Sequence, residues 1–274
     1  MAYNTTDKDK QLAAAKDTAA KIKRERILMA ALLAGYFLPI AREFERMYRD
    51  TRGTPNMLKH ELKLNEILNK NYTATSNKFI NQVRKALGEP VNATEINNQI
   101  VATQKVTQLR DIHLSRTSIA NTTKDTLNNA LQEIIVSAAA AGIPLTNKDV
   151  AKQTKDKFIT DSKGRLPTIG ITQTQQAAEN AKHVEMDALV RNNAVFVKAG
   201  IDLAKDKIEK TWVPILDSRT RAAHAAADLQ TVDFNGVYTV GGQQLRFPGD
   251  TSLGATPNNT INCRCSSVKS IKRS

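Results

Sequence analysis

The chain has 274 residues, of which 41% are hydrophobic and 5% aromatic. That length suits one or two ordinary domains, and the low aromatic share favours long helices over a β-sandwich or barrel. Lys and Arg number 40 against 27 Asp and Glu, so the net charge of +13 points to a polyanionic partner: nucleic acid, an acidic protein surface or a membrane face. Two cysteines exclude a disulfide-stapled scaffold.

Neither membrane insertion nor secretion is expected. The longest apolar stretch, residues 27–40, spans about 14 residues and is interrupted by Gly35 and Pro39, whereas a spanning helix needs about 20. It also begins too far from Met1, after too many charged residues, to be an ordinary signal peptide. We therefore expect a protein made in a reducing cytoplasm, without a membrane partner.

Helical patterns dominate the first 160 residues. Apolar residues recur there at three- and four-residue spacing, and Gly and Pro supply the breaks. We expect the Thr- and Asn-rich segment 115–123 to break the third pattern, and the segment 161–167, with its Gly and Pro, to be a loop. The expected helices are residues 7–52, 56–87, 94–141, 146–159 and 172–210, the last broken near Gly200.

Strand signals begin only after Trp212. Residues 237–240 and 243–247 flank Gly241-Gly242, a pattern typical of a β-hairpin with a two-glycine turn. Residues 261–268 are a further candidate strand. The predicted fold is mainly α: an elongated helical region, residues 1–160, followed by a small α+β module, residues 161–274.

Most residues with distinctive chemistry lie in the last 63 positions. They form a W-x4-D-x-R-T-R-x-x-H run, then D-x-Q, then Pro-Gly, and finally N-C-R-C. The residues are Trp212, Asp217, Arg219, Thr220, Arg221, His224, Asp228, Gln230, Pro248, Gly249, Asn262, Cys263, Arg264 and Cys265.

This series resembles the C-terminal module of the head morphogenesis family, the Mu-type minor capsid proteins of tailed phages. That module shows a Trp, a D-x-R-T-R-x-x-H run, a Pro-Gly pair and a closing N-C-R-C. Residues 217–224 match the run in full, and residues 262–265 match the close. The resemblance covers about residues 165–268 and leaves the helical region unassigned.

The chain departs from the family pattern at two places. Residues 227–230 read Ala-Asp-Leu-Gln where the family commonly has Leu-Asp-Gly-Gln. Residues 169–173 read Ile-Gly-Ile-Thr-Gln where the family often has Ile-Ala-Arg-Thr-Glu. Because some relatives resemble ADP-ribosyltransferases, the missing Arg and Glu argue against an enzyme, and no catalytic residue is assigned.

The two cysteines can serve one site. On an extended segment, positions i and i+2 face the same side, so Cys263 and Cys265 can meet one object. Together with His224 and a carboxylate, Asp217 or Asp228, they would form a tetrahedral zinc site. Two readings compete: both thiols are buried as small hydrophobes, or a Cys–His pair acts as a nucleophile. Zinc is therefore a candidate cofactor, and we expect both sulfurs to lie near His224.

The arginines of the module allow two roles. Arg219, Arg221, Arg246 and Arg264 lie among the carboxylates of residues 217, 228, 233 and 250. We favour Arg–carboxylate pairs that tie loops together, and contact with phosphate is the alternative.

A second group of arginines lies in the first helical pattern. Arg42, Arg46, Arg49 and Arg52 fall on one stripe of a helix, at 100° per residue. The stripe is either a solvated face or a contact with DNA phosphates or an acidic protein. Neither a helix-turn-helix nor a phosphate-binding loop is visible, so any DNA contact would be nonspecific.

The resemblance implies a structural, non-enzymatic component of a phage head. It would dock on the portal protein, contact the major capsid or scaffolding protein, and lie close to packaged double-stranded DNA. It would be located in the virion, at the portal vertex or inside the head, after assembly in the host cytoplasm. The alternatives are an internal virion protein ejected with the genome, and a metal-dependent nuclease or transferase carried by the C-terminal module.

Overall fold

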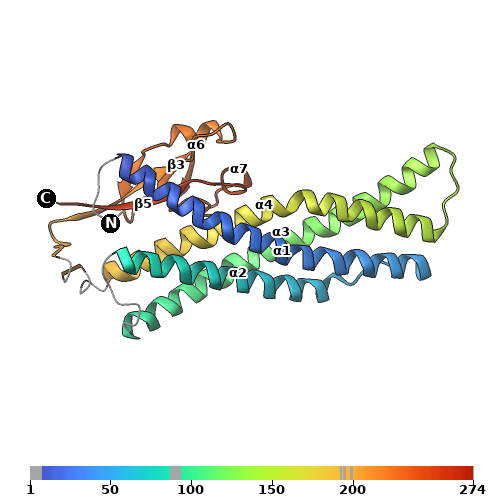
Figure 1. The fold of residues 1–274 in the computed structure, drawn as a ribbon, viewed down its shortest axis with the longest axis horizontal. Coiled ribbons are helices and arrows are strands. Elements are labelled where there is room, and N and C mark those ends of the chain that lie inside the picture. The colour runs from blue at the N-terminus through green and yellow to red at the C-terminus, as the bar shows by residue number, and fades with distance from the viewer. Residues whose placement is uncertain (1–7, 87–93, 192, 194–195, 198–199, 274) are drawn as a thin grey trace. The chain divides into compact units, whose positions relative to one another are not determined.

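A computed structural model describes residues 8–86, 94–191, 193, 196–197 and 200–273. The predicted fold class is confirmed: long helices come first, and a small module with antiparallel strands follows (Figure 1). The expected end of the second helix, at residue 87, lies outside the described residues. The elements are α1 (Lys8–Thr51), α2 (Met57–Ala86), α3 (Thr94–Ala140), α4 (Asn147–Arg191), β1 (Lys207–Val213), α6 (Ala222–Ala226), β2 (Thr231–Asp233), β3 (Tyr238–Val240), β4 (Gln243–Leu245), α7 (Pro257–Thr260) and β5 (Ser266–Lys272).

The chain forms two compact units, and each long helix contributes a segment to both. We call residues 27–71 and 109–170 the helical unit. Residues 1–26, 72–108 and 171–274 form the strand unit, which holds all the strands of the described chain.

The helical unit is built from segments of α1, α2, α3 and α4, paired through two short connections (Figure 1). The rings of Phe37 and Phe158 pack edge to face, with centroids 6.3 Å apart, so α1 contacts α4. Lys155 donates to Glu45 at 2.9 Å along the same contact. Buried aromatic rings and a few polar pairs therefore hold this bundle together.

Side-chain caps fix where two of these helices begin. Asn56 accepts from the backbone N–H of Leu58 at 3.0 Å at the start of α2. Before α4, Asp149 accepts from the N–H of Thr146 at 3.0 Å, and Thr146 accepts from the N–H of Asp149 at 3.2 Å. These contacts satisfy donors that have no partner within the helix.

The predicted break at residues 115–123 is wrong, because α3 runs without interruption through them. The hydroxyls of Thr117, Thr122 and Thr123 donate to carbonyls four residues earlier in the same helix. The side chains expected to compete with the helix thus bond to it instead. Ile112 and Ile119 are buried, so packing supports the segment as well.

The predicted loop at residues 161–167 is also wrong, because α4 continues through Gly164 and Pro167. Ser162 and Ile169 are buried on either side, and Arg165 donates to the hydroxyl of Thr126 at 3.1 Å. Tertiary contacts therefore outweigh the low helix propensity of Gly and Pro here. The expected helix over residues 172–210 ends at Arg191 instead, and β1 begins at Lys207.

One helix, α1, contains a window between Leu12 and Thr51 that is long and apolar enough to cross a membrane. Buried core helices of soluble proteins pass the same test of length and composition. Its apolar side chains Leu33, Ile40 and Phe44 are fully buried, which gives this stretch a packing role in the helical unit.

The strand unit contains a three-stranded antiparallel sheet in the order β2-β1-β5. Trp212 of β1 pairs with Ser267 of β5, and Lys210 pairs with Lys269. Strand β5 lies at one edge of this sheet, and all its residues except Lys272 are buried. Its start at Ser266 lies near the end of the predicted strand 261–268.

The predicted hairpin is confirmed as β3 and β4. Gly241 and Gly242 connect the strands with φ of 55° and 75°, the left-handed values that a tight two-residue turn requires. Asn259 donates to the carbonyl of Val240 at 2.9 Å, and Gln230 accepts from the N–H of Thr239 at 2.8 Å. The Gln of the D-x-Q step thus holds the hairpin in place.

Candidate metal centre

One buried group of side chains in the strand unit has the composition of a metal site. His224 lies on α6, and Cys263 and Cys265 lie on the extended segment between α7 and β5. The Nδ1 atom of His224 is 3.3 Å from Sγ of Cys265 and 3.8 Å from Sγ of Cys263. The prediction that both sulfurs face His224 is therefore confirmed.

Packing fixes the position of this His-Cys-Cys group. The ring of Trp212 meets the ring of His224 edge to face at 5.6 Å, and Trp212 shares a buried cluster with both cysteines. Asn262 adopts φ of 56°, a conformation that Asn tolerates better than most residues, and its N–H donates to Thr172 at 2.8 Å. The cysteine segment is thus anchored on one side by β1 and on the other by α4.

The spacing of the three ligand atoms fits a thiophilic ion. All three atoms lie within 4.8 Å of one another. A tetrahedral zinc ion would need N···S distances of about 3.6 Å and an S···S distance of about 3.8 Å. A pocket of about 10 Å³ adjoins the group, which is space for one atom-sized occupant. Three protein ligands can therefore hold a metal with only small shifts.

The two thiols are electrostatically unequal. A hydrogen bond from Cys265 and the nearby imidazole of His224 lower the pKa of Cys263 to about 5. The same interaction with Cys263, together with burial, raises the pKa of Cys265. The two pKa values are thus shifted in opposite directions, and a bound cation would stabilise both thiolates.

Asp217 is not among the atoms that converge on this group. Arg264 donates to both of its carboxylate oxygens, at 2.7 and 2.5 Å, and the N–H of Arg219 donates to it at 3.0 Å. These contacts, that with Arg264 above all, lower the pKa of Asp217. Thr220 completes the turn by accepting from the N–H of Asp217 at 3.1 Å. In the described part of the chain, the ligand group is therefore His224 with the two cysteines.

The remaining motif residues make structural contacts. Arg221 donates to the carbonyl of Ile261, and Arg246 pairs with buried Asp250 at 3.1 Å next to the Pro248-Gly249 turn. Asp228 takes part through its backbone, donating to the carbonyl of Ala225. These contacts match the role that we favoured for the arginines.

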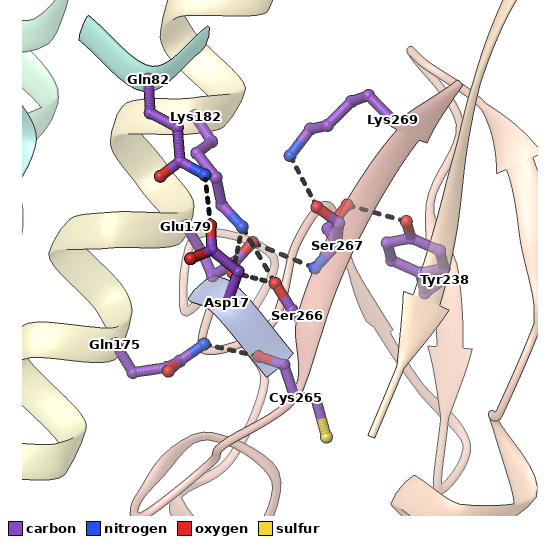
Figure 2. A network of polar contacts seen from close by, with 10 residues as sticks. All are labelled: Asp17, Gln82, Gln175, Glu179, Lys182, Tyr238, Cys265, Ser266, Ser267 and Lys269. Carbon is purple, nitrogen blue, oxygen red and sulfur yellow. Dashed lines mark hydrogen bonds and ion pairs between the residues drawn. The ribbon is translucent and has the colours of Figure 1, made fainter. Parts of the chain in front are cut away.

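A buried polar network on α4 is missing from the sequence-based predictions (Figure 2). Glu179 is fully buried and accepts from the N–H of Ser267, the hydroxyl of Ser266 and the ammonium of Lys182, at 3.1, 2.8 and 2.5 Å. Gln175 donates to the carbonyl of Cys265. Side chains of α4 thus provide hydrogen-bond partners for backbone groups at the free edge of β5. This edge is therefore covered and not available for pairing with another strand. The only sequence signal for this network is a set of polar residues at helical spacing.

The face of the sheet that carries Trp212 also carries buried lysine side chains. Lys269 donates to the carbonyl of Ser267 at 3.2 Å, and Lys210 donates to the carbonyl of Arg246 at 2.7 Å. Burial lowers the pKa of Lys210 to about 8 and that of Lys269 well below its usual value. Burial and these neighbouring cations lower the pKa of His183 to about 3 and keep its ring neutral.

The four arginines of the predicted stripe differ in their contacts. All four are exposed along α1 and just after it. Arg49 pairs with Asp50 at 2.7 Å, and Arg52 donates to Asn147 at 2.9 Å. Arg42 and Arg46 instead line a groove in the helical unit.

Comparisons with protein-family models, with curated proteins and with solved structures find no match for this chain.

Proposed function

We propose that this protein is a structural minor capsid protein of a phage head, of the head morphogenesis type, which docks on the portal. The observation that carries the proposal is that the separated parts of the family-like pattern contact one another. Thr172 meets Asn262, Asp217 meets Arg264, and His224 meets Cys265. Residues 90, 47 and 41 positions apart thus form one small module.

The roles of these residues support a structural module. Trp212 is buried in its core, and Gln230 and Asn259 hold the hairpin through backbone atoms. The arginines of the motif bond to carboxylates and carbonyls within the module. In this proposal, the long helices dock on the portal, and the basic surface lies near packaged DNA.

Zinc is the cofactor that we propose for the His-Cys-Cys group. Two thiolates and one imidazole suit zinc, and a metal there would join α6 to the segment before β5. It would supply a cross-link between parts of the module that are distant in sequence. Metal analysis of the purified protein is the direct test: we expect close to one zinc per chain, and its loss in Cys263→Ser.

The experiment that tests the phage proposal follows the chain in assembled particles. The phage that encodes it is propagated with the wild-type chain, with Trp212→Ala and with Trp212→Phe as the conservative control. Particle yield, DNA content and infectivity are scored separately, and the chain is located in purified heads by electron microscopy. We expect it at the portal vertex, with Trp212→Ala lowering its incorporation and Trp212→Phe retaining it.

Two other outcomes would replace this proposal. Delivery of the chain into the cell with the genome would make it an ejected internal protein. A His224→Gln variant that is incorporated normally but has lost a chemical activity would make the module an enzyme. Absence of the chain from heads and from portal complexes would contradict a capsid role.

A further inference from the structure

An open groove runs between α1 and α2 in the helical unit. Its volume is about 650 Å³, within the range of pockets that hold several side chains or a small ligand. Its wall and rim come from two helices that are adjacent in sequence. The lining residues used below are Gly35, Pro39, Arg42, Arg46, Lys63 and Leu62.

Two cationic side chains of the groove, Arg42 and Arg46, are available to pair with a ligand. Its two carboxylates are already engaged, since Glu43 contacts His60 at 2.8 Å and Glu66 contacts Lys63 at 2.7 Å. Arg42 and Arg46 are exposed, and neither forms an ion pair with a carboxylate in the described part of the chain. The groove therefore presents an excess of positive charge on the α1 side.

The groove also has exposed apolar residues in its lining. Leu62 is 61% exposed, which is high for a leucine that lies next to a concave surface. Pro39, which lines the same groove, is also exposed. A Cβ atom added at Gly35 would meet nothing within 4 Å, so this glycine leaves space in the groove at the expense of helix propensity.

We propose that this groove binds an acidic amphipathic helix of a protein partner. Apolar side chains of that helix would contact Leu62 and Pro39, and its carboxylates would pair with Arg42 and Arg46. Recognition of a helix by a groove between two helices combines such apolar anchors with charges at the rim. The inference rests on the groove alone and is independent of the phage assignment.

The exposed apolar residues of the groove distinguish this occupant from duplex DNA. A nonspecific DNA surface needs cations that follow the phosphates, and it gains nothing from an exposed leucine and an open glycine in the same groove. Two of the four stripe arginines, Arg49 and Arg52, also have partners within the protein. Arg42 and Arg46 are thus the members of the stripe that line the groove, together with the exposed apolar residues Leu62 and Pro39.

The test measures binding of a labelled probe peptide to the full-length chain by fluorescence anisotropy. The probe is an 18-residue helix with leucines on one face and glutamates beside them. A second peptide has lysine at every glutamate position, and a 20-base-pair duplex is the third probe. We expect the acidic peptide to bind and the lysine peptide not to bind.

Three variants locate the binding. Arg42→Glu with Arg46→Glu should weaken binding of the acidic peptide by about tenfold or more, because two pairs become repulsive. Gly35→Leu should weaken it by about fivefold or more without any change in charge, since it fills open space and is favourable in a helix. Lys124→Glu with Lys163→Glu changes the charge equally at exposed sites of the same unit, and binding should stay within about twofold.

Circular dichroism and thermal unfolding of each variant confirm that the bundle is intact. The proposal is overturned if the acidic peptide does not bind, if Gly35→Leu binds it like the wild type, or if the control pair weakens binding as much as the arginine pair. Duplex binding that depends on Arg42 and Arg46 and is blocked by Gly35→Leu would assign the groove to nucleic acid instead.

Discussion

Arg264 forms a bidentate ion pair with Asp217, 47 residues away in the sequence. Its two terminal nitrogens donate to the two carboxylate oxygens at 2.7 and 2.5 Å. This fork-to-carboxylate contact joins the loop after β1 to the segment that carries the two cysteines. Lysine cannot reproduce it, because it offers a single charged nitrogen. The pair therefore orients the cysteine segment from outside the ligand group.

The contact predicts a pH dependence of stability. The pKa of Asp217 in the folded protein is lowered, chiefly by Arg264, below the value of about 3.9 in the unfolded chain. Its contribution is therefore present above pH 4 and is lost as the pH falls further. We expect Asp217→Asn to lower the free energy of unfolding at pH 7, with the difference from wild type narrowing between pH 5 and pH 2. Urea titrations across this range measure it, and a difference that does not change with pH would contradict the assignment.

The burial of Trp212 predicts that its side chain contributes strongly to the stability of the strand unit. It is fully buried and packs edge to face against Tyr238 and His224. Trp212→Ala should cost about 3–5 kcal/mol, the usual range for deleting a large buried aromatic ring. Trp212→Phe keeps most of the apolar volume and should cost less. Denaturant unfolding monitored by near-ultraviolet circular dichroism distinguishes them, and equal costs for both variants would argue against packing as the cause.

Metal removal gives the third prediction. If the His-Cys-Cys group holds zinc, a chelator should lower the melting temperature of the wild type, because the bound ion stabilises only the folded state. Cys263→Ser, Cys265→Ser and His224→Gln should each lose zinc and become insensitive to the chelator. Differential scanning calorimetry with and without chelator measures this. Wild-type protein that contains no metal and melts at the same temperature with chelator would identify the cysteines as core residues.

The burial of the Lys269 side chain predicts that an apolar residue at this position can stabilise the protein. Burial, together with repulsion from Lys182, lowers its pKa well below the usual value of 10.5. Between this lowered pKa and the usual value, the unfolded chain binds more protons than the folded protein, so stability should rise as the pH increases toward 10. Lys269→Met should remove that rise and leave stability unchanged or increase it by about 1–4 kcal/mol.

Lys272→Met is the matched control on the same strand. Lys272 is exposed and lies 3.9 Å from Glu209, so its replacement should change stability by less than about 0.5 kcal/mol. Urea unfolding at pH 7 and pH 9.5 compares the two variants. A large loss of stability in Lys269→Met would mean that its bond to the carbonyl of Ser267 outweighs the cost of burying the charge.

Some features of this protein follow from local sequence alone. The helical periodicity of the first 160 residues and the two-glycine turn at Gly241-Gly242 each depend on neighbours in the chain, so both were predictable. The approach of Cys263 and Cys265 to one side also follows from their spacing. Their meeting with His224 was expected because the motif would have to converge in a folded module.

Tertiary structure decided the rest. Helix α4 continues through Gly164 and Pro167, and α3 continues through Thr122, because contacts elsewhere outweigh local propensity. From the sequence, Asp217 could equally have been a ligand beside the cysteines. In the folded module its carboxylate is instead paired with Arg264. The helical spacing of Gln175, Glu179 and Lys182 does not reveal their role, because that role exists only where α4 lies beside the free edge of β5. Propensity and spacing act over a few residues, whereas the pairing of buried charges depends on which distant segments meet.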